Sequence, residues 1–202
     1  MHSSGEYGEN VYYAWSSASK RLTGQSLVAT ISVPFANVSL AHFSASSSFE
    51  AEFLQSHNVY RRQHGAPPLT INKNLCRSAQ AWAEHLLSIT TLKHSNKDYG
   101  ENLYYAWSSL DRSGHEAVEN WYSEIKDFNF GRPGFSSKTG HFTQVVWKDT
   151  KEVGVGLATD GNTTFVVGQY LPAGNITNAG YFEKNVLPAG TKVDSRSTGT
   201  SE

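Results

Sequence analysis

Residues 152–170 read EVGVGLATDGNTTFVVGQY, and this stretch decides the fold class. Glu152–Thr159 alternates valine and leucine with small or polar residues, which is the period-2 pattern of a strand with one buried face. Asp160-Gly161-Asn162 is typical of a tight turn, and Thr163–Tyr170 then returns as a second apolar run. We therefore expect an antiparallel β-hairpin in this part of the chain.

Three amphipathic helices are expected before the hairpin. The first runs from Phe49 to about His64, where a glycine and two prolines end it. The others cover about Lys73–Ser88 and Gly114–Lys126, each with apolar residues at helical spacing. Helices followed by a hairpin favour an α+β or three-layer arrangement, in which helices cover an antiparallel sheet.

A partial internal repeat stands at the N-terminus. Residues 2–17, HSSGEYGENVYYAWSS, match residues 94–109, HSNKDYGENLYYAWSS, at 12 of 16 positions with a constant offset of 92. The first copy lacks the long patterned segment that follows the second, so we interpret it as a fragment of a tandem domain. A second interpretation is that the two copies compete for one place in the fold and promote domain swapping.

The rest of the chain divides by composition. Residues 18–48 are rich in Ser, Ala, Thr and Val without a clean period, and we interpret them as a linker with one short strand near Leu27–Val33. Residues 49–190 form the patterned domain, and residues 191–202 are a polar tail.

The composition excludes several classes of protein. Lysine and arginine total 17 against 18 acidic residues, so there is no excess of positive charge for binding nucleic acid. No window approaches about 18 consecutive apolar residues, so no membrane-spanning helix is expected. The start MHSSGEYGEN lacks the basic and apolar regions of a signal peptide, and the single Cys76 permits no internal disulfide. These features favour a cytoplasmic protein.

Four ionisable residues occur in apolar surroundings: His94, Glu101, Glu124 and His141. Charged groups in such sequence must find partners, because an isolated buried charge is very costly. Neutral imidazoles suit Zn²⁺ or Cu²⁺, and nearby glutamates can orient the ring N–H groups or hold the water of the metal. The residues alone leave two interpretations open, which are a metal site and ordinary buried hydrogen-bonded groups.

Four further segments resemble the signature motifs of the CAP superfamily, which comprises cysteine-rich secretory, antigen 5 and pathogenesis-related proteins. They occur in the order of that family: residues 57–61, HNVYR; 100–103, GENL; 140–147, GHFTQVVW; and 165–175, FVVGQYLPAGN. The likeness covers about Phe49 to Pro188 and is strongest to a Golgi-associated branch without disulfides. Gly168 fits that branch because secreted members carry cysteine at this place.

The resemblance implies an α-β-α sandwich with a central cleft. The metal-site tetrad of the family falls on His94, Glu101, Glu124 and His141, with zinc as the implied ion. The other residues that match the family motifs are His57, Asn58, Arg61, Gly100, Asn102, Trp147, Gly174 and Asn175.

The function that the resemblance implies is a non-enzymatic binding module, located in the cytoplasm or peripherally on Golgi or other endomembranes. Its implied partners are membranes with acidic phospholipid or sterol, or further copies of the chain, and never nucleic acid. The cations Arg61, Arg62, Lys73, Arg77 and Lys93 are expected to be exposed.

Two alternatives remain. A hydrolase would use His94 and Glu101 with Ser108 or Ser109 as nucleophile, or Glu124 as base for a zinc-bound water. In the other alternative, the tetrad only joins helix to loop, and the protein acts through protein contacts.

Overall fold

A computed structural model describes residues 13–14, 36–107 and 113–192, with only the backbone described for residues 13–14 and 36–47. The strands are β1 (Tyr13–Ala14), β2 (Thr70–Ile71), β3 (Gly100–Trp107), β4 (Glu152–Thr159) and β5 (Thr163–Leu171). The helices are α1 (Ala36–Gln63), α2 (Lys73–Ile89), α3 (Gly114–Tyr122), the 3₁₀ helix η1 (Ser123–Asp127), α4 (Gly140–Val146) and α5 (Tyr181–Asn185).

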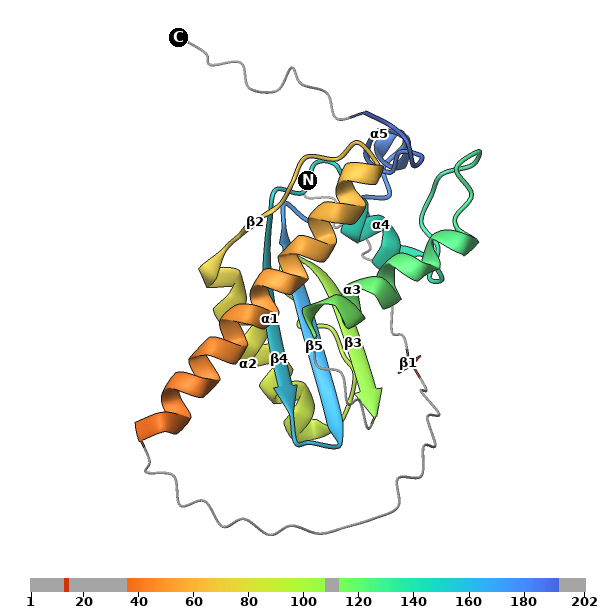
Figure 1. The fold of residues 1–202 in the computed structure, drawn as a ribbon. Coiled ribbons are helices and arrows are strands. Elements are labelled where there is room, and N and C mark those ends of the chain that lie inside the picture. The colour runs from red at the N-terminus through yellow and green to blue at the C-terminus, as the bar shows by residue number, and fades with distance from the viewer. Residues whose placement is uncertain (1–12, 15–35, 108–112, 193–202) are drawn as a thin grey trace, which may run out of the picture.

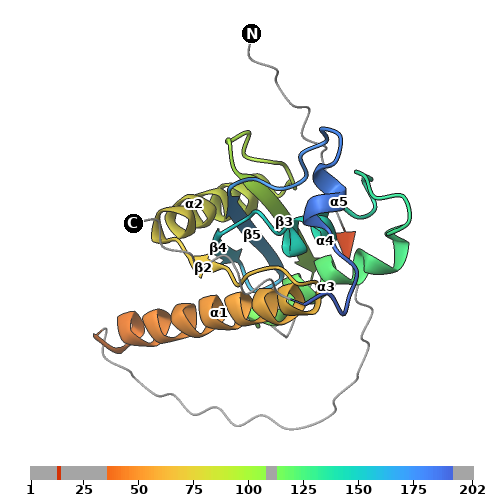
Figure 2. The ribbon, with the colours of Figure 1, turned by 90° about the horizontal axis from the view of Figure 1, so that it is seen from above.

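The described elements form three layers. Helix α2 covers one face of the sheet, whereas α1, α3 and α4 lie on the other (Figures 1 and 2). Strand β5 contributes side chains to the core on both faces of the sheet, because successive side chains of a strand point to opposite faces. Phe165 and Val167 pack with the α2 residues, and Val166 and Tyr170 pack with Phe53 of α1 and Trp121 of α3. The predicted α-β-α sandwich is confirmed.

The hairpin has the predicted bounds within one residue. β4 and β5 pair antiparallel from Glu152↔Leu171 to Thr159↔Thr164. The carboxylate of Asp160 accepts the backbone N–H groups of Asn162 and Thr163 at 2.9 and 2.7 Å, and Gly161 adopts a φ of 97°. The Asp-Gly pair therefore closes the turn by the chemistry expected from the sequence.

The expectation of a purely antiparallel sheet was wrong. The strand order is β1-β3-β5-β4-β2; the three long strands pair antiparallel, but β1 pairs parallel with β3 and β2 pairs parallel with β4. Each parallel strand has two residues. A segment of that length carries no period-2 pattern, so sequence analysis could not find it.

Two helix bounds also differ from expectation. α1 begins at Ala36, 13 residues before the expected start at Phe49 and inside the segment interpreted as a linker. The third helix was expected to continue to Lys126, but it ends at Tyr122 and tightens into η1. The short strand expected near Leu27–Val33 lies outside the described residues.

Candidate functional site

A cavity of about 310 Å³ opens beside the start of β3. Its wall combines the loop before β3, the first two residues of β3, one residue of α4 and the turn after β5. The lining residues are His94, Ser95, Asn96, Lys97, Asp98, Tyr99, Gly100, Glu101, Gln144, Gly174 and Asn175.

His94 and Glu101 form the first of two histidine–glutamate pairs. Nδ1 of His94 lies 2.8 Å from Oε1 of Glu101, and both side chains line the cavity. The same carboxylate accepts the backbone N–H of Ser95 at 2.9 Å and its hydroxyl at 2.6 Å. Gln169 on β5 donates a further hydrogen bond at 3.0 Å.

These contacts set the charge of Glu101. Burial disfavours the carboxylate form, but the hydrogen bonds from His94, Ser95 and Gln169 outweigh it and lower the pKa of Glu101 below its ordinary value. The cavity wall therefore carries a carboxylate whose oxygens are already occupied by donors.

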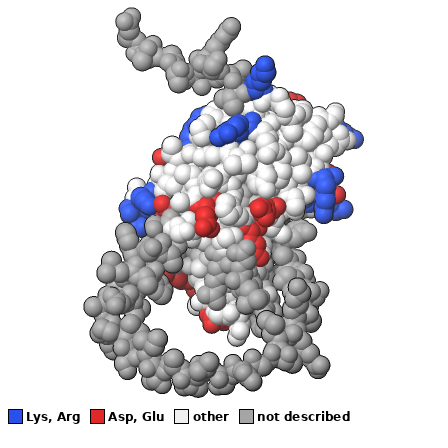
Figure 3. All heavy atoms as spheres, in the orientation of Figure 1, with Lys and Arg blue, Asp and Glu red and all other residues white. Residues whose placement is uncertain are grey.

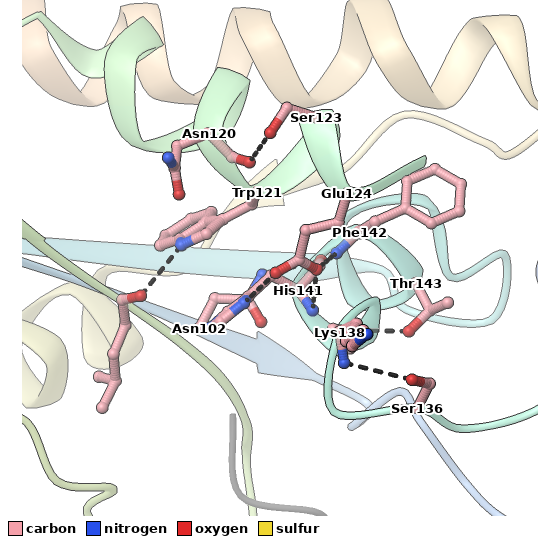
Figure 4. A network of polar contacts seen from close by, with 12 residues as sticks. Asn102, Asn120, Trp121, Ser123, Glu124, Ser136, Lys138, His141, Phe142 and Thr143 are labelled. Carbon is pink, nitrogen blue, oxygen red and sulfur yellow. Dashed lines mark hydrogen bonds and ion pairs between the residues drawn. The ribbon is translucent and has the colours of Figure 1, made fainter. Parts of the chain in front are cut away.

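His141 and Glu124 form the second pair (Figure 4). Nδ1 of His141 lies 2.8 Å from Oε1 of Glu124, and Oε2 accepts the backbone N–H groups of His141 and Phe142, each at 3.0 Å. The imidazole stacks on Trp121 with ring centroids 6.2 Å apart and an interplanar angle of 11°. Glu124 thus connects η1 to the first turn of α4 and orients the histidine ring.

The second ring nitrogen of His141, Nε2, does not take part in the contact with Glu124. Because a carboxylate only accepts, Nδ1 carries the proton of this contact, and in the corresponding neutral tautomer Nε2 presents a lone pair. Nε2 is buried and has no hydrogen-bond partner among the residues that the structure describes. A buried polar atom without a partner costs roughly 1–3 kcal/mol. This atom therefore needs an explanation beyond packing.

The two pairs do not form a cage of four ligands. Asn175, which lines the cavity, donates to the carbonyl of Gly140 at 2.8 Å, next to His141. Among residues 36–107 and 113–192, no three His, Cys, Asp or Glu side chains converge closely enough to hold a metal ion together. The residues present could instead offer a metal ion two imidazoles, those of His94 and His141, each hydrogen-bonded to a glutamate.

His57, Asn58 and Arg61 support the fold from within. Nδ1–H of His57 donates to the carbonyl of Phe53 at 2.9 Å, so Nε2 accepts the hydroxyl of Tyr170 at 2.8 Å. Burial lowers the pKa of His57 to about 3. The amide of Asn58 exchanges hydrogen bonds with both backbone groups of Leu69.

Arg61 was expected to be an exposed cation, and this was wrong. It is fully buried and donates hydrogen bonds to four backbone carbonyls at 2.8–3.1 Å. Burial lowers its pKa to about 10. Periodicity could not reveal this, because three of the four acceptors, Val145, Trp147 and Thr150, are more than 80 positions away in the sequence; the fourth is Pro67.

The remaining motif residues shape the cavity wall. The side-chain oxygen of Gln144 accepts the N–H of Gly174 at 2.9 Å. A Cβ at Gly100 or at Gly174 would collide with the Gln144 amide, and one at Gly174 also with the ring of Trp147, so an added methyl group would displace the Gln144 side chain. Asn102 donates to the carbonyl of His141 at 3.1 Å, and Trp147 is fully buried in the core.

Sequence analysis missed three residues that make hydrogen bonds at the site, Ser95, Gln144 and Gln169, and also the cavity-lining residues 96–99. Gln169 faces Glu101 directly across the β3–β5 ladder. The strand alternation of 163–170 could have placed Gln169 on the same face as Glu101, had β3 been recognised as a strand. Ser95 directly follows His94 and Gln144 lies within the motif 140–147, but serine and glutamine are not residue types that indicate a metal site.

Comparisons with known proteins agree with this architecture. The model of the cysteine-rich secretory protein family, CAP, matches residues 54–170. The chain is 54% identical over 151 residues to Golgi-associated plant pathogenesis-related protein 1 of Homo sapiens, covering 72% of this chain and 96% of that protein. It is 35% identical to pathogenesis-related protein 1 of Arabidopsis thaliana, covering 63% of this chain and 78% of that protein.

Protein PRY2 of Saccharomyces cerevisiae is 37% identical over 69% of this chain, which spans only 41% of the length of PRY2. Among solved structures, BmVAL-1 and NaASP2 with Zn²⁺ align with TM-scores of 0.56 and 0.58, each at 24% identity. They cover 73% and 71% of this chain, and 83% and 87% of their own. At that identity the likeness establishes the fold. No helix among the described residues is both long and apolar enough to cross a bilayer.

Proposed function

Because this chain belongs to the cysteine-rich secretory protein (CAP) family, we propose that it is a non-enzymatic binding module whose two histidine–glutamate pairs hold a divalent metal ion, zinc. Its partner is a membrane that carries acidic phospholipid. His94 and His141 would hold the ion, and Glu101 and Glu124 would orient the two rings from behind.

The single observation that carries the metal proposal is the unpartnered Nε2 of His141. A metal-bound histidine characteristically donates its other N–H to a carboxylate, as Nδ1 of His141 does to Glu124. His94 meets Glu101 through the same atom types and at the same distance of 2.8 Å. When bound, a divalent ion supplies positive charge at the cavity wall, where it attracts anionic groups.

The occupied carboxylates favour binding over catalysis. The oxygens of Glu124 accept three N–H groups and those of Glu101 accept four hydrogen bonds, so taking a proton from a water or a serine would compete with these contacts. Ser108 and Ser109, the nucleophiles of the alternative hydrolase, lie outside the described residues.

The proposal of membrane binding is supported by the similarity to a Golgi-associated relative and by exposed basic side chains. The relative from Homo sapiens is named as Golgi-associated, which supports a peripheral endomembrane location for this chain. Arg62, Arg77 and Lys93 are exposed, whereas exposed Lys73 pairs with Glu50 at 2.6 Å. On the face in Figure 3, basic side chains lie toward the periphery and acidic ones gather over the middle. Membrane attraction through such scattered cations is modest, so we assign a bound ion an essential part in it.

Zinc binding is tested by isothermal titration calorimetry on the full chain. We expect stoichiometric zinc binding to the wild type and its loss in the double variant His94→Ala/His141→Ala. His85→Ala is the matched control, because His85 is an exposed histidine on α2 outside the cavity. Undiminished zinc binding by the double variant would overturn the metal assignment.

Membrane binding is tested by flotation with phosphatidylinositol-containing vesicles, with and without zinc, and with phosphatidylcholine vesicles as the control. We expect zinc-dependent flotation that is lost in the double variant. Absence of flotation under every condition would overturn the membrane part and favour a protein partner. Lower thermal stability on chelation, with flotation unchanged, would favour a purely structural ion.

A further inference from the structure

The N-terminal repeat meets its own second copy in the sheet. β1 pairs parallel with β3, with Tyr13 opposite Tyr105 and Ala14 opposite Ala106. The register of this ladder is 105 − 13 = 92 and 106 − 14 = 92. The sequence repeat has the same offset, 92, over residues 2–17 and 94–109. Each residue of β1 therefore lies opposite its counterpart in the other copy.

The shared offset of 92 means that the β1–β3 ladder pairs equivalent residues of the two copies. A parallel ladder could adopt other registers, but the one observed brings identical residues side by side, which is the arrangement of stacked identical segments. The first copy does not take the place of β3 against β5, since β3 itself pairs with β5 along all eight of its residues. The two copies are neighbours in one sheet, which differs from the competition for one place considered in the sequence analysis.

The site of contact is the edge of the sheet. In the described part of the chain, β1 is the strand on the outer side of β3, and its ladder covers two of the eight β3 residues. Without it β3 would be the edge strand, and an edge strand presents backbone N–H and C=O groups that pair readily with another chain. Trp107, at the end of β3, keeps 60% of its surface exposed.

We propose that the outer edge of β3 is a strand-addition site, and that its occupant is the N-terminal repeat of the same chain, residues 2–17. Main-chain hydrogen bonds supply the affinity in this mode of recognition. GENVYYAW at 8–15 matches GENLYYAW of β3 at seven of eight positions, and its valine, tyrosines and tryptophan favour extended structure. The repeat thereby shields an edge that would otherwise pair between molecules. This proposal is independent of the proposed metal and membrane functions.

Backbone substitution in β1 tests the proposal in the full chain. In a parallel ladder alternate residues bond to the partner strand, so the double variant Tyr13→Pro/Ala14→Pro removes the donor whichever residue supplies it. The matched control is Tyr13→Val/Ala14→Thr, which changes the side chains but keeps both N–H groups and strand propensity. Neither variant alters residues 49–190, and equal melting temperatures verify that the domain is intact.

The measurement is amide hydrogen exchange of β3. We expect exchange of the β3 amides that point away from β5 to rise about tenfold in the proline variant and to stay at the wild-type rate in the control. A synthetic peptide of residues 2–17 should restore protection to the proline variant. The same peptide with proline at both positions should not.

Two results would overturn the proposal. Equal exchange of β3 in the wild type and the proline variant would show that the repeat does not cover the edge. Protection that falls when the wild type is diluted a hundredfold would identify a second copy, and not the same chain, as the occupant.

Discussion

Glu124 and His141 lie 17 positions apart in the chain, yet Oε1 of the first lies 2.8 Å from Nδ1 of the second, and both side chains are buried. The same carboxylate accepts two backbone N–H groups at the start of α4. One side chain therefore fixes the end of η1, the start of α4 and the protonation of one histidine nitrogen.

Removing this carboxylate should destabilise the domain. Glu124→Ala leaves the N–H groups of His141 and Phe142 and the imidazole Nδ1–H buried without acceptors. We expect the free energy of unfolding to fall by at least about 3 kcal/mol, because each of the three unsatisfied buried groups costs roughly 1–3 kcal/mol. Urea denaturation measures the change. Glu119→Ala, an exposed glutamate on α3, is the control. An equal loss in both variants would mean that the buried contacts contribute nothing.

A milder change separates orientation from stability. In Glu124→Gln the oxygen can still accept the two backbone N–H groups, but the amide NH₂ faces Nδ1 and favours the tautomer with the proton on Nε2. The lone pair that we assign to zinc is then lost. We expect the dissociation constant for zinc to rise about 10- to 100-fold. Calorimetry on Glu124→Gln and on Glu119→Gln checks this; equal affinity in the two variants would contradict the assigned role of Glu124.

The acid sensitivity of the fold should depend on His57. Burial lowers the pKa of this histidine to about 3, the charge of Arg61 acts in the same direction, and the hydrogen bond to Phe53 opposes it. The unfolded chain, with a pKa near 6.5, binds a proton that the folded chain excludes. This contribution to stability is complete above pH 6.5 and is lost as the pH falls toward 3.

The expected slope is about 1.4 kcal/mol per pH unit near pH 5. Urea denaturation of the wild type between pH 7 and 5 should show it, and His57→Gln should reduce the slope by that amount even though the variant is less stable overall. Burial also lowers the pKa of His64, so part of the slope remains in the variant. Identical slopes in the two proteins would show that folding does not lower the pKa of His57.

Local elements and motif positions could be predicted from the sequence, whereas the contacts between residues distant in the sequence are known only from the structure. The hairpin was predictable because alternation and the Asp160-Gly161 turn are local signals. The four residues of the candidate site stood out by their apolar surroundings in the sequence, and the family resemblance assigned them to a metal site; the structure brings them together as two pairs. That Glu101 meets Gln169 was not predictable without strand register, because they are 68 positions apart.

The start of α1 could not be predicted from the local sequence. Residues 36–48 lack a helical period, yet the backbone is helical from Ala36. The short strand β2 was not predicted either, because it has only two residues and is defined by its pairing with β4. For β2 the signal lies in the pairing with β4 and not in the local pattern.

The close packing of α2 on β4 provides a last prediction, which concerns the layer opposite the cavity. A Cβ at Gly156 would lie inside van der Waals contact of the backbone of Ala79 and Gln80, so the helix could not remain at its present distance from the strand. We expect Gly156→Ala to lower the free energy of unfolding by about 3 kcal/mol. Gly134→Ala is the matched control, because nothing lies within 4 Å of the added methyl group. Thermal denaturation of both variants decides the matter: equal melting temperatures would mean that the helix can move away from the sheet without cost, and that glycine is not required at this contact.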